Sequence, residues 1–372
     1  MKIKNKFLTE KEEDSKYYSG KEFLKVFPYV AFDGNENIGE GDSLCYYLKD
    51  DYIGWIIEIE KTELINPSLI ISSITDFFRK HKVKGCSLNV CLFKDEDGNN
   101  RCFFSLKFPL KAELFGDFKS LGKEIYKNRE ILNSVINSLS EYFGEVKFIF
   151  PKDLTEFVVD FIFNQKETNF DDRISIWENF IPEKNSSFLI HKNLIDSGQS
   201  LLKIISPKTF GRNPDYLINE IMDVYLNYDI EFLYNTIFSF TVSVVNKHND
   251  FIRNLFKKRM HIYDKDVWGH KDFGEWESGT EREDSVSFHL LINLVLKSQS
   301  KEEMSLKLDF FKSIAEKMLW EIEEEGKEIL NIRAVSSFPL GFYISSFDFI
   351  KRGDFIRFIN KKEGESDVKS QW

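Results

Sequence analysis

The sequence predicts an α+β protein made of two α/β sandwich-like halves, whose largely antiparallel or mixed sheets are covered by helices on one face. Strand-like and helix-like patterns alternate along most of the chain, which indicates mixed secondary structure. Several strands alternate between apolar and polar residues, which is typical of a sheet with one buried and one solvated face. The polar stretch 164–173, NQKETNFDDR, separates the two sets of elements.

A chain of 372 residues with 42% hydrophobic content can bury a large core and predicts about two domains. We expect flexible, charged tails at residues 1–20 and 361–372. Between the tails, the elements divide into an N-terminal α/β subdomain at 21–165, a linker at 166–185 and a second α/β subdomain at 186–360.

In the first half, segments dense in Ile, Val, Phe and Tyr predict strands at residues 43–48, 52–60, 86–93, 101–111 and 145–150. A helix is expected at 67–80, because Asn66 can cap its first turn. An apolar stripe predicts a second helix that stops near Gly144. A capping-box-like start at Asp153 predicts a third helix that ends around Phe163.

In the second half, strict alternation of apolar and polar residues predicts strands at 237–245 and 287–296. Ser239 and Thr241 alternate away from the apolar residues of the first strand, so we expect them on a solvated face. We also expect a long helical segment at 249–276, a helix opened by a capping box at 302–325 and a final strand at 328–343.

The formal net charge of −10 and the pI near 5.4 disfavour a protein that binds nucleic acid, because phosphate binding needs a concentrated basic surface. No apolar run reaches the ~18 residues of a membrane span, and the polar start does not resemble a secretory signal. We therefore expect a cytoplasmic chain. Its cysteines have no metal-ligand spacing and predict buried, reduced thiols at Cys45, Cys86, Cys91 and Cys102.

The sequence contains none of the common catalytic or phosphate-binding motifs. Gly-Lys pairs begin at Gly20, Gly122 and Gly326, but none is followed by Ser or Thr, so the sequence contains no phosphate-binding loop. GxGxxG, HExxH and GxSxG are also absent from the sequence. We expect no enzymatic activity, no catalytic or metal-binding residue and no cofactor in this chain.

One acidic segment leaves an alternative open. Residues 261–284 gather histidines and carboxylates, which are ligands of hard and borderline cations, so a metal-dependent enzyme is the competing hypothesis. A solvated connection pinned to the core by Trp268, Phe273 and Trp276 has the same composition, and we favour it.

The order of segments resembles the start of the TraC family, the VirB-type ATPases of type IV secretion and conjugative transfer. The resemblance begins with Phe27-Pro28-Tyr29, continues with Gly54, Trp55 and Glu58 in the second strand of a pair, and extends over residues 23–359. Gly274-Glu275-Trp276 and the Pro-Leu pair at Pro339 match later landmarks of the family.

In this family a RecA-like ATPase domain follows the matched region, whereas this chain ends at Trp372 before such a domain. The resemblance implies an N-terminal assembly and docking region, without nucleotide hydrolysis, that binds inner-membrane subunits at the cytoplasmic face and contributes to hexamer assembly. A truncated, stand-alone TraC-like protein that modulates full-length hexamers, or a remnant of a conjugation system, is the alternative.

The same resemblance implies that partner-binding residues lie at Pro28, Tyr29, Gly54, Trp55 and Glu58. Glu58 alternates away from the apolar residues of its strand and has no second acid or histidine suited to catalysis nearby in sequence. Because a lone buried carboxylate is costly, we expect Glu58 at a solvated face or in an ion pair. Its expected role is structural or partner-facing, and Glu58→Gln is expected to leave folding nearly intact.

Overall fold

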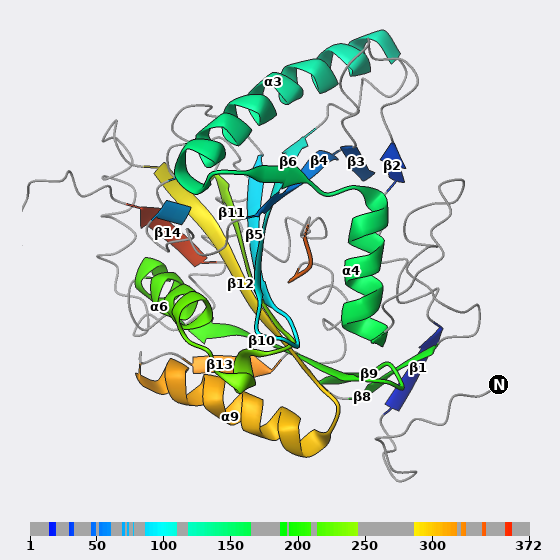
Figure 1. Cartoon of the computed structure of the whole chain (residues 1–372), viewed down its shortest axis with the longest axis vertical. Helices are drawn as coiled ribbons and strands as arrows, with labels where there is room; N and C mark the ends of the chain where they lie inside the picture. The colour runs from blue at the N-terminus through cyan, green and yellow to red at the C-terminus, as the bar shows by residue number, and fades with distance from the viewer. Residues whose placement is uncertain are drawn as a thin grey trace, which may run out of the picture.

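The computed structural model describes residues 15–19, 30–32, 46–49, 52–60, 69–70, 73, 77, 86–109, 118–164, 187–191, 193–209, 214–244, 286–317, 321–324, 337–339 and 354–358. These residues form helices and an extensive sheet in which every described strand pair is antiparallel, which confirms the predicted α+β class (Figure 1). The main path of the sheet has the strand order β1-β8-β9-β10-β12-β11-β5-β6-β4-β3-β2. None of the helices in these ranges combines the length and hydropathy that crossing a membrane requires.

The N-terminal part of the chain contributes strands β1 (Ser15–Ser19), β2 (Val30–Phe32), β3 (Tyr46–Lys49), β4 (Tyr52–Ile59), β5 (Ser87–Lys94), β6 (Asn100–Pro109) and β7 (Val146–Phe148). The C-terminal part contributes β8 (Ser187–His191), β9 (Leu194–Asp196), β10 (Leu201–Thr209), β11 (Thr236–Val244), β12 (Val286–Ser298), β13 (Glu321–Glu324) and β14 (Asp354–Phe358). Strands β7, β13 and β14 pair with β4, β10 and β12, off the main path.

The two predicted halves share this sheet. Strand β11 pairs with β5 from Thr236 opposite Lys94 to Ser243 opposite Ser87, so β5 lies between β11 and β6. The predicted linker at 166–185 lies outside the described residues. The expected tail at 1–20 is wrong for Ser15–Ser19, because these residues form β1 and pair with β8.

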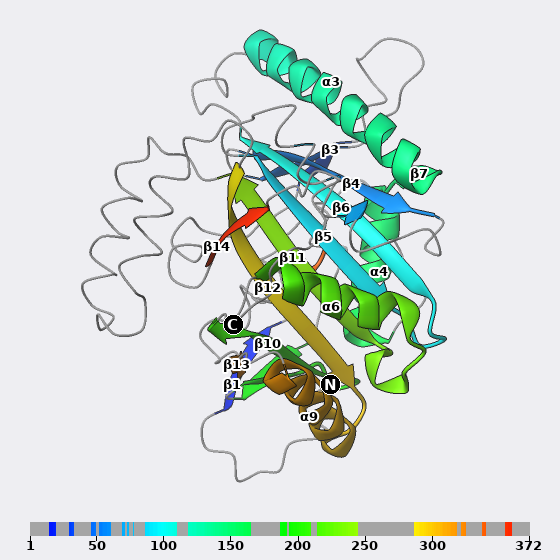
Figure 2. The same ribbon diagram turned by 90° about the vertical axis from the view of Figure 1, so that its left-hand side faces the viewer.

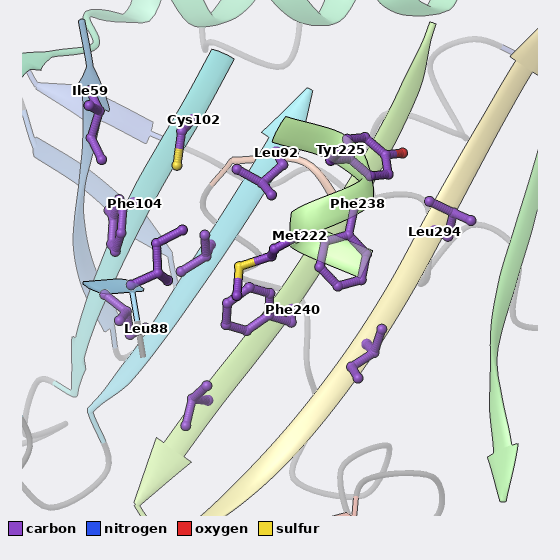
Figure 3. Packing of buried hydrophobic residues seen from close by; sticks show 14 of the residues in the cluster. Ile59, Leu88, Leu92, Cys102, Phe104, Met222, Tyr225, Phe238, Phe240 and Leu294 are labelled. Carbon is purple, nitrogen blue, oxygen red and sulfur yellow. The ribbon is translucent and has the colours of Figure 1, made fainter. Parts of the chain in front are cut away.

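The first face of the sheet carries the apolar core. Alternate residues of β4, β5, β6, β11 and β12 point to this face, where helices α3 (Phe118–Phe143), α6 (Pro214–Asn227) and α9 (Lys301–Lys317) pack on them. Figure 3 shows Met222 and Tyr225 of α6 against Leu92, Phe238 and Phe240 of the sheet. These buried apolar side chains supply most of the driving force for folding.

The second face is covered as well, although helices were expected on one face. Helix α4 (Pro151–Phe163) lies behind the sheet when α6 is in front of it (Figure 2). The ring of Phe157 lies 5.1 Å from Phe93 and 5.2 Å from Phe103, and Phe338 packs on Phe157 at 6.2 Å. The expectation of a solvated face at Ser239 and Thr241 is therefore wrong, since both residues are buried at 1% and 2% exposure.

Two further differences from the prediction concern the chain after β12. The helix expected at 302–325 ends at Lys317, and residues Glu321–Glu324 form β13. Strand β13 pairs with β10, and Glu324 of β13 forms ion pairs with Lys203 at 2.7 Å and with Lys312 at 3.1 Å. These contacts with β10 and α9 override the helical periodicity of the segment. The long helical segment expected at 249–276 lies outside the described residues.

The β5–β6 hairpin turn is built by one aspartate. Asp95 Oδ1 accepts hydrogen bonds from the backbone N–H groups of Asp97 and Asn99, at 2.9 and 2.8 Å. Gly98 has φ +83°, and a Cβ atom there would lie 2.9 Å from the Tyr234 hydroxyl oxygen. Both the positive φ and the close approach require glycine at this position.

Candidate functional site

The residues expected to bind a partner are mostly inside the protein. Pro28 and Tyr29 lie outside the described residues, whereas Gly54, Trp55 and Glu58 lie in β4 and are all buried. Trp55 is 1% exposed, and its ring lies 5.7 Å from that of Phe108 in an edge-on arrangement. In this structure none of the three β4 residues presents a side chain on the surface, so they cannot form a contact surface as they stand.

Glu58 is held in an ion-pair network at the junction of three strands. Its Oε1 accepts a hydrogen bond from Arg101 Nε at 2.6 Å, and its Oε2 lies 3.2 Å from Lys147 Nζ. The carboxylate side chain is 6% exposed, while the side chains of Arg101 and Lys147 are 35% and 51% exposed. Of the two placements expected for Glu58, the ion pair is confirmed and the solvated face is wrong.

The strand registers explain how these three residues meet. Lys147 of β7 is paired directly with Glu58. In β6 the residue paired with Glu58 is Phe103, and Arg101 lies two residues before it on the same face of the sheet. The guanidinium of Arg101 also lies over the rings of Phe103 and Phe157, at 4.8 and 5.4 Å from their centroids. Such cation–π contacts add to the ion pair, so the network fastens α4 to the second face of the sheet.

A polar band crosses the same face beside this network. Asn89 Nδ2 donates hydrogen bonds to Ser239 Oγ at 2.8 Å and to Thr241 Oγ1 at 3.0 Å, across the β5–β11 pair. All three residues are buried. Because buried polar groups are costly when unpaired, these hydrogen bonds favour this register over a slipped one.

Three buried lysines at one end of the sheet bond to backbone carbonyls of neighbouring helices and strands. Lys94 Nζ donates to the carbonyl of Tyr228, just after α6, at 2.8 Å, and Lys297 Nζ donates to the carbonyl of Asp160 in the last turn of α4 at 3.3 Å. Lys307 Nζ donates to the Lys297 carbonyl at 2.8 Å. Lys94 and Lys297 place cations at the C-terminal ends of α6 and α4, which stabilises these helices, whereas Lys307 ties α9 to β12.

Burial lowers the pKa of all three lysines, because it disfavours the charged form. The pKa of Lys297 falls to about 8, and its ammonium lies 5.1 Å from the centroid of the Phe161 ring. A lowered lysine pKa can signal a catalytic amine. Here each amine is buried and bonded to backbone carbonyls, so we assign these lysines to anchoring.

The β9–β10 turn also anchors α4. The hydroxyls of Ser197 and Ser200 both donate to the carbonyl of Ile162, at 2.9 and 2.8 Å. Asp196 Oδ1 accepts a hydrogen bond from the N–H of Gly198 at 2.7 Å, and burial raises the pKa of this carboxyl. The serines thus satisfy a carbonyl that the end of the helix leaves unpaired.

The described cysteines are buried thiols, as predicted. Cys86, Cys91 and Cys102 are free and fully buried, and burial raises the pKa of each thiol. Cys45 lies outside the described residues, as does the whole acidic segment 261–284 that carries the metal-site hypothesis. Among the residues that the structure places, no group of three histidine, cysteine or acidic side chains could hold a metal ion.

A small apolar recess lies between the first face of the sheet and the helices α6 and α9. Its volume is about 40 Å³, and Phe238, Leu294 and Phe311 are among its lining side chains. The lining contains one hydroxyl, that of Ser206, and no charged side chain. This recess can accept a few apolar atoms, but it has no group for acid–base or nucleophilic chemistry.

Comparison with known proteins places the chain in no family. No family model matches it, and no curated protein matches it. Among solved structures, "BBE-like #28 from Arabidopsis thaliana" is similar at 12% sequence identity and a TM-score of 0.31. The match covers 75% of this chain and 46% of that protein, so this chain spans less than half of its length. A TM-score this low carries no argument about fold or function.

Proposed function

We propose that this chain is the N-terminal assembly and docking region of a TraC-like ATPase in a type IV secretion system for conjugative transfer. In this role it binds inner-membrane subunits from the cytoplasmic side, contributes to assembly of the ATPase hexamer and hydrolyses no nucleotide itself. The observation that carries the proposal is the ordered match of sequence segments from Phe27-Pro28-Tyr29 to Pro339, which includes Gly54, Trp55 and Glu58.

The geometry supports a binding module. The charged side chains of the second face and of the sheet end contact other parts of the same chain: Glu58 contacts two cations, and Lys94, Lys297 and Lys307 bond to carbonyls. These contacts fix strands and helices relative to one another, which suits a rigid scaffold. Rigid scaffolds bind partners through apolar surface patches and sheet edges, and β1 and β2 end the described sheet path.

A pull-down of the full chain tests this function. The tagged chain is incubated with detergent-solubilised inner-membrane subunits of the conjugation system from the same cells, with an unrelated inner-membrane protein as the control. We expect retention of the conjugation subunits and not of the control. Overexpression of the chain in donor cells should also lower transfer frequency, because the chain competes with the cell's own ATPase for the docking sites. No retention together with unchanged transfer would refute the proposal.

A further inference from the structure

Helix α9 carries an exposed apolar side chain at Leu306, next to Phe310, which is partly buried and packs against the core. Leu306 is 56% exposed, and Phe310 lies one turn further along the helix. Phe232 of the short helix η4 (Glu231–Leu233) is 38% exposed, and its ring lies 5.7 Å from that of Phe310. These three side chains form one apolar strip, which we name the outer face of α9. In Figure 1, α9 lies at the bottom edge of the molecule.

The fold covers this strip only in part. The inward side of α9 carries the buried residues Met304, Lys307, Leu308, Phe311 and Ala315, and Phe310 is partly buried against the same core, whereas Leu306 and Phe232 are exposed. Single exposed apolar residues are ordinary on protein surfaces, but a contiguous group marks an interaction site more often. The outer face of α9 therefore has surface to bury that the fold itself leaves in solvent.

Carboxylates border the strip. Glu302, Asp309 and Glu316 are exposed and follow one another at intervals of seven residues. Seven residues are close to two helical turns, so the three carboxylates lie along one side of α9, about 40 to 80° around the helix from Leu306. Exposed Glu231 precedes Phe232 on η4. The rim of the outer face therefore carries these four carboxylates, and exposed Lys317 lies at the C-terminal end of the strip.

We propose that the outer face of α9 binds an amphipathic helix of a partner protein whose apolar side is bordered by Lys or Arg. An apolar seam flanked by charges at seven-residue spacing is the arrangement that paired helices use, where opposite charges beside the seam set partner choice. An anionic membrane surface is the wrong counterpart, because the carboxylates of the rim would repel it. This inference rests on the proposed docking role and names a surface for it.

Fluorescence anisotropy with the full chain provides the test. The probe is a fluorescein-labelled Leu–Lys peptide about five turns long that forms an amphipathic helix. We expect Leu306→Ser, and separately the double change Glu302→Lys and Asp309→Lys, to weaken binding about 10-fold or more, since each removes a central contact or the complementary charge. The charge-reversed protein should gain binding to the matching Leu–Glu peptide.

Matched variants on α3 control for non-specific attraction, because the chain carries a net charge of −10. Tyr126 is 61% exposed, so Tyr126→Ser is matched to Leu306→Ser, and the double change Glu124→Lys and Glu130→Lys is matched to the charge reversal. We expect affinities within about 2-fold of the unmodified chain for both controls. Equal affinity for Leu306→Ser and the unmodified chain, or equal losses for α9 and α3 variants, would overturn the inference.

Three further outcomes separate the α9 proposal from lipid binding and from the secretion role. Binding to phosphatidylcholine vesicles that Leu306→Ser abolishes, without binding to the peptide, would assign the outer face of α9 to a lipid surface and overturn the proposal. If the pull-down retains the inner-membrane subunits equally with Leu306→Ser, the docking role stands and the α9 surface is refuted. If the pull-down fails while the peptide binds as expected, the secretion role is refuted and the α9 surface stands.

Discussion

Arg101→Met should destabilise the protein more than Glu58→Gln, although both changes remove the same ion pair. Arg101→Met leaves a carboxylate that is 6% exposed with Lys147 as its remaining cation, 3.2 Å away and itself 51% exposed. Stranding a buried charge costs about 3–5 kcal/mol when no partner remains, so we expect a loss of about 2–4 kcal/mol in the free energy of unfolding. Methionine retains much of the apolar contact with the neighbouring rings.

Glu58→Gln removes the buried charge itself and leaves two cations that water can reach, because Arg101 and Lys147 are 35% and 51% exposed. Its amide oxygen can still accept one hydrogen bond, so the expected loss is about 1 kcal/mol. The double variant should be more stable than Arg101→Met alone, since it strands no carboxylate. Because Glu58 is buried, stability rather than partner binding is the property that Glu58→Gln changes.

Urea unfolding at pH 7, followed by far-ultraviolet circular dichroism, measures these differences. Lys152→Met is the control, because the Lys152–Glu156 pair spans 3.8 Å between side chains that are 63% and 41% exposed, and exposed pairs contribute about 0.5 kcal/mol or less. A loss for Arg101→Met no larger than that for Glu58→Gln would refute the prediction. A double variant less stable than Arg101→Met would refute it as well.

Three other predictions follow from single sites. The pKa of Lys297 is about 8 in the folded protein and 10.5 unfolded, so the unfolded chain binds more protons between these values. Relative to Lys297→Met, the native protein should therefore gain stability as pH rises from 8 to 10.5, by about 3 kcal/mol at most; a flat difference in urea unfolding would contradict this. Gly98→Ala should cost about 1–2 kcal/mol, measured as a lower urea midpoint, because φ is +83° and the new Cβ would approach the Tyr234 hydroxyl. In a Cys45→Ser protein, dithionitrobenzoate should label no thiol until urea unfolds the chain, and rapid labelling without urea would refute burial of the remaining thiols, at Cys86, Cys91 and Cys102.

Several strands could be located from sequence to within one or two residues. Expected strands at 52–60, 86–93 and 237–245 correspond to Tyr52–Ile59, Ser87–Lys94 and Thr236–Val244. Their local patterns are strong, since alternating β-branched and aromatic residues fit a pleated surface. No strand was expected between residues 187 and 209, where β8, β9 and β10 lie. There the runs are short, and pairing with other strands decides the structure.

The faces of the site residues could be predicted from the sequence, but their contacts could not. Alternation correctly put Glu58 and Trp55 on opposite faces of β4. It could not show that β7 brings Lys147 to Glu58, because the two residues are far apart in the chain. The anchoring lysines Lys94, Lys297 and Lys307 gave no sequence signal, since lysines at strand ends and on helices are normally solvated.

The sequence by itself determined the α+β class, the faces on which side chains of β4 and β11 lie, and the burial of the described thiols. These properties depend on local periodicity and residue type. The tertiary structure decided that both faces of the sheet are covered, that β5 joins β11 and so unites the two halves, and that Glu58 is paired. A period of two shows which residues share a face but not what packs on it, because that depends on chain segments far away in sequence.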